Sequence, residues 1–131
     1  MVIDTSALVA ILLAEEESDR LVEAIARDGT RIIGTPAWVE ATAVMLARRG
    51  SGGEIALDAL IGRLGIEVVE LTVDAARLAR LGYARFGKGV GDPGVLNYGD
   101  TFSYGVAMAT GEPLLFKGDD FVHTDVERVE Y

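Results

Sequence analysis

The stretch Met1-Val2-Ile3-Asp4-Thr5-Ser6 places an acidic residue directly after three apolar residues. Residues 1–5 are typical of a short buried strand. The apolar residues from about 6 to 13 predict a helix, for which Ser6 is a suitable N-cap. A carboxylate between a strand and a helix lies where open α/β sheets bind their ligands, beyond the carboxyl ends of the strands. The stretch therefore predicts an α/β fold with a polar site near Asp4.

The remainder of the chain continues this alternation of strands and helices. Strands are predicted at about 31–34, 67–71 and 113–116, with a last edge strand at 128–131. Helices are predicted at about 18–27, 36–49, 54–63, 73–85 and 101–110. The alternation predicts a mainly parallel sheet covered on both faces, in a three-layer α/β/α arrangement. Because no repeat or domain boundary interrupts the pattern, we expect one domain over residues 1–131.

Two glycine-rich segments separate the predicted helices. The residues Gly50-Ser51-Gly52-Gly53 predict the most flexible stretch of the chain, after a helix that starts with Thr35 as N-cap and Pro36 as its first residue. The segment 87–94 contains Gly-Lys-Gly, as some phosphate-binding loops do. No strand leads into it and no Ser or Thr follows the lysine, so we favour a mobile loop beside a site over a P-loop.

The composition restricts the class of protein. Half of the 131 residues are apolar, which predicts a folded core rather than a disordered chain. There is no apolar run of the ~20 residues that a membrane helix needs, and no signal-peptide pattern. Cysteine is absent, which excludes disulfides, thiolate nucleophiles and cysteine metal sites. We expect a cytoplasmic protein without a membrane partner.

The net charge of −9 argues against a nucleic-acid partner without excluding one. A cluster of carboxylates adds negative charge that a bound divalent ion would partly cancel. Basic residues are also locally grouped, and each could contact RNA or simply be solvated at the surface. These candidates are Arg48, Arg49, Arg85, Lys88 and Lys117.

Four acidic positions lie at the edges of apolar segments: Asp4, Glu40, Asp100 and one of the pair Asp119 and Asp120. Each has a structural alternative when taken alone. Asp4 and Asp100 could cap helices, Glu40 would be favoured by the helix dipole, and the aspartate pair could be ordinary turn residues. Their joint placement at strand ends and helix starts instead predicts that they converge.

Converging carboxylates, with one histidine and no cysteine, indicate oxygen ligands for Mg²⁺ or Mn²⁺. Carboxylates ~3–4 Å apart either raise one another's pKa or bind a metal. A divalent ion held in this way supports metal-assisted hydrolysis of a phosphodiester bond. The single histidine, His123, is expected to be a surface loop residue rather than a base.

Three segments carry a family resemblance over nearly the full chain. Val2-Ile3-Asp4-Thr5-Ser6-Ala7-Leu8 resembles the opening strand motif of PIN-domain ribonucleases. The segment 96–105, with the order Tyr98-Gly99-Asp100-Thr101, resembles their third-acid segment. The segment 113–121, continuing to Asp125, resembles the closing segment of VapC-type toxins of toxin–antitoxin pairs. The resemblance implies a Rossmann-like PIN fold and an endoribonuclease that uses Mg²⁺ or Mn²⁺.

The resemblance also implies roles for individual residues. Asp4, Glu40 and Asp100 match the metal-binding acids of the family, and Ser6 matches the hydroxyl beside the first acid. In many relatives the fourth acid stands at the position of Gly118, so Asp119 is our first choice for it and Asp120 the second. The resemblance further implies an RNA substrate such as a tRNA or rRNA loop, a homodimer, and inhibition by a VapB-like antitoxin. The acidic charge suits a basic inhibitory segment.

Other classes of protein explain the pattern less well. A receiver domain needs an adjacent acidic pair on its first strand, and Asp4-Thr5 does not provide one. A phosphatase of the Asp-x-Asp type would need an aspartate where Ser6 stands. The alternative that stays open is a catalytically silent PIN-like module that acts through partner binding, because the fourth acid is displaced.

Overall fold

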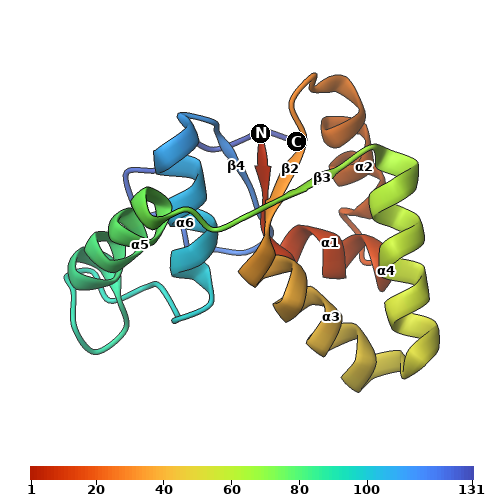
Figure 1. Ribbon diagram of the computed structural model, residues 1–131, viewed down its shortest axis with the longest axis horizontal. Helices are drawn as coiled ribbons and strands as arrows, with labels where there is room; N and C mark the ends of the chain where they lie inside the picture. Colours follow the sequence, from red (N-terminus) through yellow and green to blue (C-terminus); the bar gives the residue numbers. More distant parts are fainter.

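The computed structural model describes residues 1–131 and places a parallel sheet of four short strands at the centre of the molecule (Figure 1). The strands are β1 (Val2–Ile3), β2 (Ile32–Gly34), β3 (Glu67–Val69) and β4 (Leu114–Leu115). Their order in the sheet is β3-β2-β1-β4, and every strand pair is parallel. Since parallel strands need crossover connections, the alternation in the sequence leads directly to this topology.

Helices cover both faces of the sheet, which confirms the three-layer α/β/α prediction. The helices α1 (Thr5–Leu12), α2 (Ser18–Arg27), α3 (Thr35–Arg49) and α4 (Ser51–Leu64) lie on one side in Figure 1. The helices α5 (Val73–Phe86) and α6 (Asp100–Thr110) lie on the other. No helix is both long enough and apolar enough to cross a membrane.

Alternation along the strands divides the core into two clusters, because successive strand residues point to opposite faces. One residue of each buried strand packs with α1–α4: Ile3, Ile33 and Leu115. Its neighbour packs with the α5–α6 side: Val2, Ile32 and Leu114. Strands of only two or three residues are thus held by apolar contacts on both faces, at roughly 25 cal/mol per Å² of apolar area buried.

Two predicted boundaries were wrong. Ser51, Gly52 and Gly53 are not a flexible break, because α4 starts at Ser51, directly after the cap residue Gly50. Gly53 lies so close to α3 that a Cβ there would come within 2.3 Å of the Met45 carbonyl oxygen. Glycine at this position therefore permits close packing of two helices rather than mobility. Residues 128–131 form no strand, and Arg128 makes only an isolated bridge to Leu114.

Two helix starts also differ from the prediction. The N-cap of α1 is Asp4, not Ser6, since the Asp4 side chain accepts a hydrogen bond from the Ser6 backbone N–H. Thr35 is the first residue of α3 and Gly34 is its cap. The Thr35 hydroxyl instead accepts from the Leu71 N–H at 3.3 Å, which ties α3 to the segment after β3.

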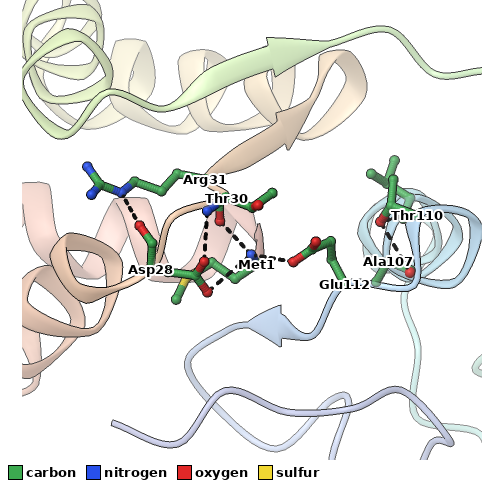
Figure 2. Close-up of polar contacts among 8 residues, drawn as sticks. Met1, Asp28, Thr30, Arg31, Ala107, Thr110 and Glu112 are labelled. Atoms are coloured by element: carbon green, nitrogen blue, oxygen red, sulfur yellow. Dashed lines mark hydrogen bonds and ion pairs between the residues drawn. The ribbon is translucent and has the colours of Figure 1, made fainter.

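The amino ends of the strands are fastened separately from their carboxyl ends. Figure 2 shows the amino group of Met1 between two carboxylates, Glu112 at 2.8 Å and Asp28 at 3.3 Å. The same group donates to the Thr30 carbonyl. These contacts join β1 to the turns before β2 and β4. They leave the opposite edge of the sheet, where Asp4 lies, free of that network.

Candidate functional site

Asp4 lies where β1 ends and α1 begins, and it is the most firmly held acid of the chain. It is only 4% exposed. Its Oδ2 accepts from the Ser6 backbone N–H at 2.9 Å and from the Ser6 hydroxyl at 2.6 Å. Its Oδ1 accepts from the Ser103 hydroxyl at 2.6 Å. These three bonds fix the orientation of the carboxylate and offset the cost of burying its charge.

Ser6 also joins the first and last segments of the fold. Its hydroxyl donates to Asp4 and accepts from the Lys117 backbone N–H at 3.0 Å. The Ser6 hydroxyl therefore lies beside the first acid, where the sequence placed it. Ser103, by contrast, was missed in the sequence. A serine on an apolar helix carries no signal for a partner 99 residues away.

Glu40 projects from α3 toward the same edge of the sheet. Its Oε2 lies 2.9 Å from the Thr5 hydroxyl, which also lies 3.0 Å from the Ala37 carbonyl. Partial burial of the carboxyl group raises the pKa of Glu40, the Thr5 hydrogen bond opposes this, and the charge of Asp4 adds to it. A Cβ at Gly99 would lie 2.6 Å from Glu40 Oε1, so a larger residue there would displace the carboxylate from the start of α6.

Asp100 is the first residue of α6, and its Oδ2 accepts from the Asn97 N–H at 2.7 Å. Burial raises the pKa of Asp100 to about 6, although the Asn97 hydrogen bond lowers it. The negative charges of Asp4, Asp120 and Glu40 also contribute to this raised pKa. Three acids from distant parts of the sequence therefore act on Asp100 at the carboxyl ends of the strands.

Asp119 and Asp120 lie in different surroundings. Asp120 contributes to the field on Asp100 and lies 3.5 Å from the Lys88 ammonium group. Asp119 is exposed and lines a separate hollow with Glu17 and Arg20. This placement favours Asp120 as the fourth acid, whereas the sequence led us to put Asp119 first. Gly118 adopts a left-handed φ of 100°, which turns the chain just before the pair.

The donor set suits a hard cation such as Mg²⁺. No group of three acidic or histidine side chains is arranged closely enough to enclose a metal ion by itself. Mg²⁺ does not require such a cage, since it keeps several waters and takes one or two carboxylates together with substrate phosphate oxygens. Asp4, Glu40, Asp100 and Asp120 are the residues that would hold such an ion together with its waters.

The basic residues predicted to contact RNA differ in whether a carboxylate pairs with their positive charge. Lys117 pairs with Glu15 and Glu17, Arg85 with Asp125, and Lys88 with Asp120. Arg48 and Arg49 are exposed and unpaired in the last turn of α3, where cations also favour the helix dipole. Arg48 is eight residues beyond Glu40, or roughly 12 Å along the helix. His123 is exposed, as expected for a surface loop residue.

The parallel sheet, with acidic side chains gathered at the carboxyl ends of its strands, defines an α/β domain with a carboxylate site. The family model of the PIN domain matches residues 1–127. The chain belongs to the PIN domain family, which confirms the resemblance in the sequence.

Similar proteins carry VapC names. The chain is 46% identical to ribonuclease VapC30 of Mycobacterium tuberculosis over 129 residues, which cover 98% of both chains. Among solved structures, VapC20 of M. tuberculosis, described as a sarcin–ricin loop cleaving toxin, superposes with a TM-score of 0.78 at 17% identity. That superposition covers 98% of this chain and 97% of VapC20. VapBC2 of Rickettsia felis, bound to a promoter DNA fragment, gives a TM-score of 0.75 at 15% identity, covering 98% and 96%. These two structures support the fold.

Proposed function

We propose that the chain is an endoribonuclease toxin that depends on Mg²⁺ or Mn²⁺ and hydrolyses phosphodiester bonds in RNA. The observation that carries the proposal is the gathering of acids around the start of α6. Asp4 accepts a hydrogen bond from Ser103 of this helix, a Cβ on Gly99 would lie 2.6 Å from Glu40 Oε1, and the charge of Asp120 acts on Asp100. The chain is also nearly half identical to a protein named ribonuclease VapC30. In this proposal tRNA or rRNA loops are the substrates, and the protein acts in the cytoplasm.

The side chains would prepare the site in distinct ways. Asp4, held by Ser6 and Ser103, presents a fixed carboxylate, and Asp100 presents a second from α6. Glu40 and Asp120 would add negative charge that favours a divalent cation and would hold its water ligands. When bound, the metal would supply an activated water and stabilise charge on the leaving oxygen. In the net reaction the water oxygen would bond to phosphorus and the bond to the leaving ribose oxygen would break, and the proton that the water loses balances the one that the leaving oxygen takes up.

Two partners belong to the proposal. An antitoxin of the VapB type would inhibit the enzyme with a basic segment, because the chain carries 21 acidic and only 12 basic residues. A homodimer is supported by apolar side chains that α3 leaves exposed. Val39 and Leu46 lie seven residues apart on the same face of this helix and are both exposed.

The test is cleavage of total cellular RNA by antitoxin-free protein in EDTA, Mg²⁺ or Mn²⁺. Asp4→Asn removes the charge with little change in volume, and Asp58→Asn on the exposed side of α4 is the matched control. We expect discrete fragments that require the metal, persist with Asp58→Asn and vanish with Asp4→Asn. Equal products from wild type and Asp4→Asn would indicate a contaminating nuclease. No products from any of the proteins, together with weak metal binding, would favour the silent PIN-like module.

A further inference from the structure

A mostly apolar hollow lies beside the acidic site, between α5, the glycine-rich loop and the start of α6. Its volume is about 440 Å³, within the range of small-ligand sites, and seven of its nine lining residues are apolar. The proposed catalytic machinery uses none of them. We call it the α5–α6 hollow, and its main walls are formed by Arg80, Tyr83, Val90, Tyr98, Thr101 and Phe102.

Tyr98 is the most unusual residue of the hollow. Its side chain is 72% exposed, although tyrosine carries a large apolar ring. The ring meets Phe102 edge to face, with centroids 5.0 Å apart and an angle of 86° between the planes. Because Tyr98 is mostly exposed despite this contact, much of its ring surface is open to a ligand. Tyr98 also stands two residues before Asp100, so its backbone lies within about 7 Å of that acid's backbone.

Arg80 supplies an uncommitted positive charge at the same place. Helix α5 carries three arginines, of which Arg77 pairs with Asp74 and Arg85 pairs with Asp125. Arg80 is exposed, has no carboxylate partner and lines the hollow. In a chain of net charge −9, a free guanidinium beside an open aromatic ring suits a ligand that is both anionic and planar.

We propose that the α5–α6 hollow binds one unstacked nucleotide of the RNA, next to the bond that is cleaved. This inference rests on the proposed function and names a subsite of it. The base stacks on Tyr98 and its phosphate faces Arg80. Single-stranded RNA is recognised through bases that are splayed out and stacked on aromatic rings, with cations tracking the backbone.

A second copy of the chain would be a less suitable occupant of this surface. Stable protein interfaces use roughly 20–30 residues on each side. The hollow has nine lining residues, and the exposed apolar pair Val39 and Leu46 lies on a different helix. A nucleotide, in contrast, fills a concave site of this volume and uses both the apolar wall and the free charge.

The test compares variants on an RNA that the wild type cleaves. Tyr98→Leu keeps an apolar side chain without a stacking face, and it should lower kcat/KM roughly tenfold, as expected for one lost base–aromatic stack. It should also relax the nucleotide preference at one fixed position beside the cut. Tyr98→Phe should retain both. The control Leu81→Ala changes an exposed apolar residue of α5 outside the hollow and should have no effect.

A second pair of variants tests the charge without altering the apolar wall. Arg80→Gln should raise KM and leave kcat unchanged, while Arg77→Gln on the same helix should change neither. Binding can be measured without cleavage by using the Asp4→Asn variant with Mg²⁺ present. This variant should quench the fluorescence of 2-aminopurine placed in a short single-stranded RNA. The quenching should be lost in the double variant that also carries Tyr98→Leu and retained with Tyr98→Phe.

Three outcomes would overturn the subsite. Tyr98→Leu could cleave with the rate and preference of the wild type, or quenching could be the same in all variants. Sedimentation could also show that Tyr98→Leu changes the association state, which would make the hollow an interface between copies. If the wild type cleaves no RNA, the proposed function fails, and the quenching experiment still decides whether the hollow binds a base.

Discussion

Ser103 and Asp4 are 99 residues apart in the chain, yet the Ser103 hydroxyl donates a hydrogen bond of 2.6 Å to Asp4 Oδ1. Ser103 is only 2% exposed. The bond joins α6 to the end of β1, and it leaves neither buried group without a partner. A hydrogen bond to a buried charge of this kind positions the carboxylate as well as stabilising it.

We therefore predict that Ser103→Ala destabilises the protein and weakens its metal binding. Loss of one bond to a buried carboxylate should cost about 1–3 kcal/mol, and loss of a bond that orients a ligand should lower Mn²⁺ affinity roughly tenfold. Thermal unfolding and calorimetric titration with Mn²⁺ measure the two effects. Ser51→Ala at the exposed start of α4 is the control. Unchanged Mn²⁺ affinity in Ser103→Ala would limit the serine to a role in stability.

Asp4 and Ser103 show which parts of the candidate site could be predicted from the sequence and which could not. Asp4 was found because it follows an apolar strand, and the carboxyl ends of parallel strands share one edge. Ser103 was missed because periodicity predicts which face of a helix is buried but not which distant residue it meets. Ser6 was assigned as the cap because the chemistry of Ser and Asp is equivalent at that position, and only the backbone conformation of Asp4 decides between them.

The start of α4 was predicted wrongly, and the fourth acid was left open between Asp119 and Asp120, for similar reasons. Glycines predict flexibility in isolation, but Gly53 is needed for the close contact with α3. Choosing between Asp119 and Asp120 depends on the left-handed turn at Gly118, and no pattern in the sequence specifies that direction. Element types and their order were therefore predictable, since they follow from local periodicity. Side-chain partners across the sheet were not.

Asp100→Asn should stabilise the metal-free protein at pH 7.5. Burial and the neighbouring acids raise the pKa of Asp100 to about 6 from an ordinary 3.8, so folding disfavours its charged form. The native state then binds more protons than the unfolded state between about pH 4 and 6, and stability falls as the pH rises through this window. After allowance for its partial exposure, the gain is on the order of 1 kcal/mol, or roughly 3–5 °C in Tm.

The measurement is thermal unfolding in EDTA at pH 4.5 and 7.5. The difference in Tm between Asp100→Asn and the wild type should be large at pH 7.5 and small at pH 4.5. Asp58→Asn, which removes an exposed charge on α4, should show no such dependence on pH. A Tm for Asp100→Asn below that of the wild type at pH 7.5 would contradict the mutual repulsion of the acids.

The division of the aspartate pair gives a direct comparison. Asp120→Asn removes a charge that acts on Asp100, so it should weaken Mn²⁺ binding and raise the Tm of the metal-free protein. Asp119→Asn removes the neighbouring charge, which lines the separate hollow beside Glu17 and Arg20. This variant should change neither the Mn²⁺ affinity nor the Tm. Calorimetric titration with Mn²⁺ distinguishes the two. A larger loss of affinity in Asp119→Asn would restore the order that the sequence suggested.

Asp125 anchors the segment that carries Asp120. Its Oδ1 accepts from the Tyr104 hydroxyl at 2.8 Å and its Oδ2 from Arg85 at 2.6 Å. Burial would raise the pKa of Asp125, but these two hydrogen bonds and the charge of Arg85 hold it below its usual value. The carboxylate thus ties the closing segment to both α5 and α6.

Asp125→Ala should therefore release residues 118–126 while leaving the sheet intact. Because Arg85 and Asp125 are both about half exposed, the ion pair itself contributes little, and the loss of the Tyr104 partner accounts for most of a cost of about 1 kcal/mol. Hydrogen exchange should increase in residues 118–126 and stay unchanged in β1 and β2. Asp125→Asn keeps an acceptor for Tyr104 and should show a smaller increase. Equal exchange in both variants would mean that the Arg85 charge, rather than the Tyr104 hydrogen bond, holds the segment in place.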